Sequence, residues 1–468
     1  MTRLPAAASA CWLVLAGAAT AQTPAAAPAP EPPPFARLRQ DEDYSYLADP
    51  SARTGLFDSI KYIPIGDGPA FLSLGGELRH RYEYTRNPGF GADPQDRGAF
   101  LQRYILHADL RVSPDFRLFG QFLNAFANGR AEGPSPVDQD RFDLQQAFVD
   151  IAFEPAPGAR VTLRPGRQEV RFGSARLVDV REGPNVRRTF DGARVTLKLP
   201  GWQVDALALR PVAQEQGVFD DSTSKRQALW GLYGVGKPSW LPAGSIDLYY
   251  LGFRDKAGRY DKGTAPETRH SIGTRLWGEQ DGWDWNNEFV YQFGDFGSGR
   301  INAWTAAFDV GYSWKDAWLA PRLGLATAIA SGDDNPTGRG LGTFNPLFPR
   351  GNYFSELALL GPRNFFNINP SLSLAPHRDV TLTGGVNFFW RQSLEDAVYT
   401  PNGSILRAAD GSSARYVGTE FSLSSEWRAN RYTTLTAIYS HFLPGAFIRQ
   451  TGPSKDISYL ELTLKIQL

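Results

Sequence analysis

The last nine residues, LELTLKIQL (460–468), alternate strictly between apolar and polar side chains. Successive side chains of a β-strand point to opposite sides, so this segment forms one apolar and one polar face. The apolar face holds Leu460, Leu462, Leu464, Ile466 and Leu468, and the polar face holds Glu461, Thr463, Lys465 and Gln467. Such a strand, ending at the C-terminus, is typical of a membrane-spanning β-barrel.

The same alternation recurs upstream to Phe71, in segments separated by turn residues. We therefore predict an all-β fold, a transmembrane antiparallel β-barrel of about 18 strands, an even number as single-chain bacterial barrels have. A soluble sandwich or propeller would not place charged residues on the inner face of nearly every strand. The expected strands begin near Phe71, Phe100, Phe116, Phe142, Arg160, Arg187, Trp202, Ala228, Ser245, Thr268, Trp283, Asn302, Trp318, Asn364, Val380, Arg415, Tyr432 and Asp456.

The connections between these segments alternate in length. Short ones, such as 113–115 and 200–201, are expected as periplasmic turns, and long ones as extracellular loops. The long connections are residues 87–99, 128–141, 172–186, 211–227, 331–363 and 392–414.

The N-terminal region predicts export to the bacterial outer membrane. Residues 1–21 resemble a secretory signal peptide, with a basic start at Arg3, an apolar stretch and a small-residue cleavage site at 19–21. We divide the chain into this signal peptide (1–21), a Pro/Ala-rich leader (22–34), a pre-barrel segment (35–70) and the barrel (71–468). The single cysteine, Cys11, lies in the signal peptide, so no disulfide is expected in the mature chain.

Composition and motifs disfavour several classes of protein. The 49 basic and 49 acidic residues balance, which gives no basic footprint of a nucleic-acid partner. The common hydrolase, zinc-protease and nucleotide-binding motifs do not occur, so we expect no enzyme and no cofactor. The acidic run 333–335 lacks the closing Glu of a calcium loop, so no metal site is expected there.

Arginine greatly outnumbers lysine, 40 to 9. Either the base composition of the genome or recognition of carboxylates explains this excess, because guanidinium groups bind carboxylates through two parallel hydrogen bonds. The predicted lumen path comprises Arg79, Arg81, Arg103, Arg111, Arg188, Arg194, Arg269, Arg275 and Arg391. The predicted acidic braces of the lumen are Glu77, Asp109, Asp191 and Glu288. Each arginine has the alternative role of bracing the wall by pairing across strands.

The loop at 331–363 has no periodicity and is long enough to be functional. Its candidate constriction residues are Phe344, Phe348, Arg350 and Tyr353. We expect either an inward-folded gate or a cap that seals the outer rim.

Several stretches resemble the alginate-export family of outer-membrane porins. They are LQRYILHADL (101–110), FGQ (119–121), QAFVD (146–150), GRQE (166–169), REGPNVRR (181–188), FDGAR (190–194), SGD (331–333) and LGTFNPLFP (341–349). The resemblance implies an 18-stranded monomeric barrel with an Arg-rich lumen that passes an anionic polysaccharide. The dedicated alginate exporters carry paired tryptophans where this chain has SARLVD (174–179), which indicates the broader branch of the family.

The expected function is therefore passive, electrostatically selected diffusion of an alginate-like polysaccharide or small anionic solutes. A general small-solute porin and a plugged barrel that acts as an adhesin or receptor are the alternatives. The expected partners are outer-membrane lipid and the anionic substrate. The leader either reaches a periplasmic export protein or is only a spacer.

Overall fold

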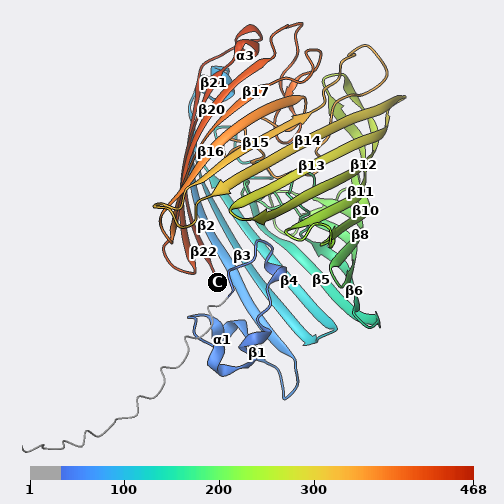
Figure 1. Ribbon diagram of the computed structural model, residues 1–468, viewed down its shortest axis with the longest axis vertical. Helices are drawn as coiled ribbons and strands as arrows, with labels where there is room; N and C mark the ends of the chain where they lie inside the picture. Colours follow the sequence, from blue (N-terminus) through green and yellow to red (C-terminus); the bar gives the residue numbers. More distant parts are fainter. Residues whose placement is uncertain (1–32) are drawn as a thin grey trace, which may run out of the picture.

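The structure, a computed structural model, describes residues 33–468 and is a closed antiparallel β-barrel of 18 strands (Figure 1). The predicted signal peptide and most of the predicted leader lie outside the described residues. The wall consists of β2 (Phe71–Arg86), β3 (Arg97–Ser113), β4 (Phe116–Asn128), β5 (Asp140–Ala156), β6 (Ala159–Gln168), β7 (Phe190–Leu199), β8 (Trp202–Ala213), β10 (Gln227–Gly236), β11 (Gly244–Tyr260), β12 (Gly263–Gln280), β13 (Trp283–Phe296), β14 (Gly299–Ser313), β15 (Arg322–Ala330), β16 (Phe365–His377), β17 (Val380–Trp390), β20 (Tyr416–Arg428), β21 (Thr433–Pro444) and β22 (Ile457–Gln467).

The C-terminal strand closes the barrel, as its alternation predicts. β22 pairs with β2 from Glu77↔Gln467 to Arg86↔Ser458, and with β21 on its other side. Leu460 and Leu462 are exposed on the outer surface, whereas Glu461 between them is 2% exposed and faces inward. Closure removes every unpaired strand edge from the wall, which a membrane-spanning sheet requires.

All 18 predicted strands are present. Among those that begin away from the predicted residue are the sixth, the tenth and the thirteenth. The sixth strand begins at Phe190 rather than near Arg187, because residues 169–189 fold into the barrel. The tenth begins at Gly263, in a long hairpin with β11. The thirteenth begins at Arg322, because Trp318 lies in a turn and is 87% exposed.

The two ends of the barrel differ. At one end, which we call the short-turn end, the strands are joined by connections such as 157–158, 200–201 and 378–379. At the other, the long-loop end, the connections include 169–189, 214–226, 331–364 and 391–415. No helix between residues 33 and 468 has the length and apolarity needed to cross a membrane.

Two of the long loops fold inward and pair with each other inside the barrel. Val178 and Phe348 form an isolated parallel bridge, with Asp179 N donating to Phe348 O at 2.9 Å. Phe348 packs against the wall residues Phe190 and Phe253, with ring centroids 5.2 and 5.5 Å apart. The main apolar core of the protein therefore lies between these loops and the inner wall.

Small elements complete the chain. The pre-barrel segment contains η1 (Arg39–Asp41), η2 (Ser45–Ala48), η3 (Pro50–Ala52), α1 (Asp58–Lys61) and β1 (Ile63–Pro64), and α1 and β1 lie below the wall at the short-turn end (Figure 1). The loops hold α2 (Pro88–Gly91), β9 (Ser222–Thr223), β18 (Val398–Tyr399), β19 (Ile405–Arg407) and α3 (Ala446–Gln450).

Candidate functional site: the charged lumen

An arginine–glutamate cluster lies inside the barrel, where the wall meets the inward loop 169–189. Its members are Arg79, Arg103 and Glu77 on β2 and β3, and Glu169, Glu182 and Arg187 on the loop. Three guanidinium groups and three carboxylates balance in charge. The three arginines are each at most 2% exposed.

Glu182 is the hub of this cluster. Its carboxylate pairs with Arg103, lies 3.4 Å from Arg187 Nη1 and 3.7 Å from Arg79 Nη1. Its side chain is 34% exposed, so it also faces open space in the lumen. Burial alone would raise the pKa of Glu182, but Arg103, Arg187 and Arg79 together hold the pKa well below its ordinary value. The three guanidiniums therefore hold the Glu182 carboxylate, and with it the inward loop, against the wall.

The remaining cluster contacts hold the arginines in place. Arg103 Nε donates to Glu77 Oε1 at 2.9 Å, and Arg187 Nη2 lies 2.8 Å from Glu169 Oε2. Arg79 donates to the backbone carbonyls of Glu182 and Pro184 at 2.8 and 2.9 Å. These contacts therefore fix the inward loop 169–189 against the wall.

The other predicted lumen arginines are also engaged in internal contacts. Arg81 pairs with Glu461, Arg111 with Asp43, Arg194 with Asp205, Arg269 with Glu267 and Arg275 with Asp247. Arg391 follows the end of β17 and donates to the carbonyls of Leu394, Ser412 and Ala414.

Arg188 differs from its predicted position. It lies in the inward loop before β7, and its Nη1 donates to the carbonyls of Asp179 and Pro349, both at 3.2 Å. It thereby joins the two inward loops to each other.

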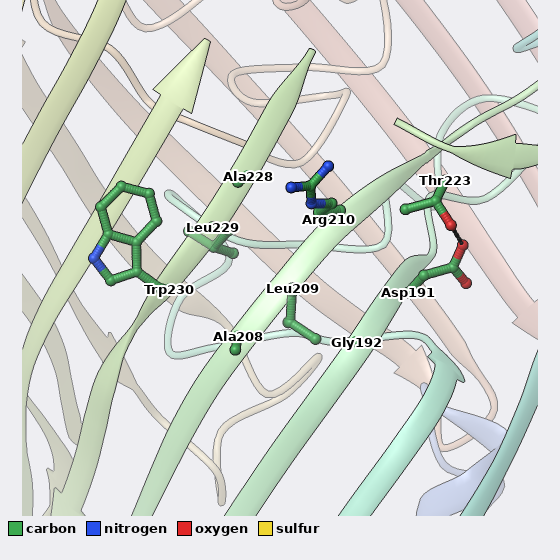
Figure 2. A pocket seen from close by; sticks show the side chains of 9 residues that line it. All are labelled: Asp191, Gly192, Ala208, Leu209, Arg210, Thr223, Ala228, Leu229 and Trp230. Atoms are coloured by element: carbon green, nitrogen blue, oxygen red, sulfur yellow. Dashed lines mark hydrogen bonds between the residues drawn. The ribbon is translucent and has the colours of Figure 1, made fainter. Parts of the chain in front are cut away.

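Three of the predicted acidic braces face the interior, and Asp191 does not. Glu77 pairs with Arg103, Asp109 with Arg117, and Glu288 with Arg176. Asp191 pairs in register with Arg210 and Arg167, on the face opposite to that of buried Phe190. It accepts hydrogen bonds from Arg167 Nε at 2.8 Å and Thr223 Oγ1 at 2.6 Å, the latter drawn in Figure 2.

Asp191 borders a shallow apolar depression of about 470 Å³ in the outer wall (Figure 2). Ala208, Ala228 and Trp230 contribute to its lining, together with exposed Arg210. Because it opens on the lipid-facing side, it lies outside the lumen path.

The predicted constriction residues of loop 331–364 divide into two pairs. Phe344 and Phe348 are 2% and 4% exposed and are packed in the core between the loop and the wall. Arg350 and Tyr353 line a lumen cavity of about 580 Å³. The other side of this cavity is rich in hydroxyl groups, from Thr381, Thr383, Ser422, Ser424 and Thr436.

A second lumen cavity, the basic vestibule, lies at the short-turn end and has a volume of about 670 Å³. Seven cationic side chains line it against five carboxylates. The cations are Arg111, Arg117, Arg160, Arg164, Arg171, Arg194 and Lys198, and the carboxylates are Asp41, Glu42, Asp43, Asp115 and Asp150. Five of these cations were not among the predicted lumen residues, although period-2 spacing along β6 and β7 places Arg160, Arg164 and Lys198 on the inner face.

The pre-barrel segment occupies part of this vestibule. Gln40 is 1% exposed. Its side-chain Nε2 donates to the backbone oxygen of Glu169 at 3.0 Å, and its backbone carbonyl accepts from Arg117 Nη2 at 2.8 Å. The backbone carbonyl of Arg37 accepts from Arg187 Nη2 at 3.1 Å. The segment thus bridges the wall and the arginine–glutamate cluster from the short-turn side.

The burial of Lys61 predicts that docking of the pre-barrel segment in the vestibule depends on pH. The ammonium group of Lys61 is buried, donates no hydrogen bond to any residue between 33 and 468, and lies 4.7 Å from the Tyr44 ring. Burial, followed by the charge of Arg39, lowers the pKa of Lys61 to about 7. When the segment is undocked, Lys61 faces water and has a pKa of about 10.4. Between about pH 7 and pH 10, Lys61 is therefore protonated in the undocked state and neutral in the docked state. Docking therefore strengthens as pH rises from about 7 to about 10, by at most about 1.4 kcal/mol per pH unit.

We expect single-channel conductance to fall as pH rises through this window, because the docked segment narrows the vestibule. Recordings at pH 7, 8.5 and 10 measure this trend. Lys61→Met should abolish it. A trend that persists unchanged in Lys61→Met would assign the pH dependence to another group.

Comparison with known proteins gives a family and a fold. The sequence model of the family described as "Alginate export" matches residues 70–458. A search among curated proteins finds no significant match. Among solved structures, Pseudomonas aeruginosa OccD3 (OpdP) is 14% identical with a TM-score of 0.57, covering 85% of this chain and 91% of its own. Acinetobacter baumannii OccAB2 is 11% identical with a TM-score of 0.59, and a BenF-like porin from Pseudomonas fluorescens Pf-5 is 11% identical with a TM-score of 0.58; each comparison covers 85% of this chain and 98% of the other.

Proposed function

Because this chain belongs to the alginate export family and forms a porin-like channel in the bacterial outer membrane, we propose that it passes anionic solutes by passive diffusion, with acidic polysaccharides as the substrate class. In this setting the short-turn end is periplasmic and the long-loop end is extracellular.

The observation that carries the proposal is that cationic side chains outnumber carboxylates in the lining of the basic vestibule. Charge lining a pore sets ion selectivity, and its effect is largest where the pore wall excludes water. Arg117, Arg171 and Arg194 pair with Asp109, Asp179 and Asp205 behind the lining. Lys198 is in no ion pair within residues 33–468, and its free charge, at the surface of the vestibule, favours the entry of anions at the periplasmic mouth. The arginine–glutamate cluster lies next along the path and already holds one carboxylate, that of Glu182.

The hydroxyl-lined cavity beside Arg350 supports a sugar as the carrier of that negative charge. Serine and threonine hydroxyls both donate and accept hydrogen bonds, as the hydroxyls of a sugar ring do. Weak sites of this kind, in series, allow a polymer to enter and to leave without an energy source.

Reversing charge in the vestibule tests the proposal. Lys198 is exposed on β7, and Arg171 is 31% exposed beside Asp179. We expect the double variant Arg171→Glu with Lys198→Glu to lower the anion-to-cation permeability ratio about threefold to tenfold, because two local charges change sign. The reversal potential across a planar bilayer under a KCl gradient measures this ratio.

The matched control is Lys315→Glu. Lys315 is exposed in the 314–321 turn at the same end of the barrel, but it does not line the vestibule. Its reversal should leave the permeability ratio within experimental error. An equal change in the control and the double variant would indicate a diffuse surface charge effect and would contradict selection in the vestibule.

A further inference from the structure

Three aspartates meet where the loop 214–226 contacts the start of β5. Asp140 and Asp143 lie on β5, and Asp221 lies on the loop; one carboxylate oxygen from each lies within 4.8 Å of the other two. We call these three residues the rim acids. They stand at the extracellular end of the wall.

Backbone pairing fixes the loop against β5. Arg141 N and Phe142 N both donate to Gly217 O, at 3.1 and 3.2 Å, and Phe219 N donates to Phe142 O at 3.0 Å. The rings of Phe142 and Phe219 are perpendicular, with centroids 5.4 Å apart. The approach of Asp221 to the β5 aspartates is therefore built by the fold and is not a chance meeting of mobile side chains.

The rim acids have too little positive charge around them. Asp143 lies 3.6 Å from Arg167 Nη1 and accepts a hydrogen bond from Asp221 N at 3.1 Å. Asp221 accepts from Glu215 N at 2.7 Å. Within residues 33–468, Arg167 is the only cation in an ion pair with any of the three, and that same arginine also pairs with Asp191.

Asp140 provides a separate indication of a ligand. It is 1% exposed, yet its Oδ1 has no hydrogen-bond partner within the described residues. A buried carboxylate oxygen without a partner is costly, and it is rarely retained unless something satisfies it. A cation between the three carboxylates would do so.

We propose that Asp140, Asp143 and Asp221 bind a divalent cation, with calcium as the ion that the ligands favour. Calcium takes oxygen ligands at 2.3–2.6 Å in flexible geometry, so two ligands of one ion are at most about 5 Å apart. The separations among the rim acids fall within that limit. The ion joins the loop 214–226 to β5 at the outer rim of the barrel.

Calcium binding is tested on the full-length barrel, folded in detergent and stripped with EDTA. Equilibrium dialysis with radioactive calcium counts bound ions in the native protein, in Asp140→Asn and in Asp221→Asn. We expect each variant to bind one ion fewer than the native protein. The control, Asp295→Asn, removes an exposed acid that pairs with Arg300 in another extracellular hairpin, and it should bind as the native protein does.

Proteolysis supplies a second readout that separates a cation site from a merely structural acid. Trypsin can cleave after exposed Lys225, within the loop. Calcium should slow this cleavage at least about tenfold in the native protein and leave both variants unprotected. In EDTA, Asp140→Asn should be the more resistant protein, since one of three like charges is gone, and calcium should reverse that order.

Equal calcium stoichiometry in the native protein and in both variants would overturn the proposal. So would greater resistance of Asp140→Asn in both EDTA and calcium, which would indicate an acid that is simply protonated. Asp221→Asn alters only the loop, so it keeps the test valid if the β5 variant fails to fold, and heat-modifiable electrophoretic mobility checks folding in each case.

Discussion

Replacing Glu182 with Gln is expected to increase single-channel conductance about twofold and to make the channel more anion-selective. The substitution leaves three buried guanidiniums with two carboxylates. Breaking a buried pair costs about 3–5 kcal/mol, and we expect the lower end here because Glu182 is 34% exposed. The segment around Glu182 should then move away from Arg79 and Arg103, which widens the lumen and exposes positive charge.

The control for this variant is Glu132→Gln. Glu132 is an 86% exposed acid of the extracellular loop 129–139, beside Arg97. It should leave conductance unchanged. Native-like conductance and selectivity in Glu182→Gln would mean that the cluster does not govern the width of the lumen.

In the native protein, low pH should weaken the docking of the loop that carries Glu182. A carboxyl whose pKa is lower in the folded state stabilises that state above its unfolded pKa, about 4.3, and loses this effect as pH falls toward the folded pKa. Because the pKa of Glu182 is well below the ordinary value, docking of its loop should persist at pH 5 and weaken only below about pH 4.

Deleting residues 35–61 while keeping residues 1–34 is expected to give the second large effect, an increase in conductance of about twofold or more. The deletion removes Gln40 and Glu42 from the vestibule, and it removes the bond from Arg39 Nη2 to Leu468 O at 2.5 Å. The β1–β2 pairing at Ile63 and Pro64 is retained, so the wall should stay closed.

Two point variants test the contribution of single residues to this increase in conductance, measured in planar-bilayer recordings. Gln40→Ala loses the hydrogen bond to Glu169 and the one from Gln146, and it should shift conductance partway toward the deletion. Leu56→Ala changes a 77% exposed side chain and should have no effect. A deletion variant with native conductance would show that the segment does not restrict the path.

The strands could be predicted from sequence because a barrel wall imposes a strict physical rule. Each wall residue faces lipid or lumen, so the polarity of Leu460, Glu461 and Leu462 reports their orientation directly. Closure by β22 against β2 follows from that alternation together with the even strand count.

The contacts of the inward loops could not be predicted in this way. Loop 169–189 has no period, and the meeting of Glu182 with Arg79 and Arg103 depends on tertiary folding across about a hundred residues. The rim acids could not be predicted for the same reason, because the fold brings Asp221 to Asp140 and Asp143 from a distant part of the chain. The prediction that Asp191 braces the lumen is wrong, because its register with Arg210 places its side chain on the outer face of the wall.

The measurement that tests the central claim most directly is block of the native channel by a polyuronate added on the periplasmic side of a planar bilayer. A neutral polysaccharide of equal length serves as the comparison. If the basic vestibule and the arginine–glutamate cluster select carboxylates, the channel should be anion-selective, and the polyuronate should interrupt its current at concentrations where the neutral polymer has no effect. A cation-selective channel, or equal block by both polymers, would contradict the account.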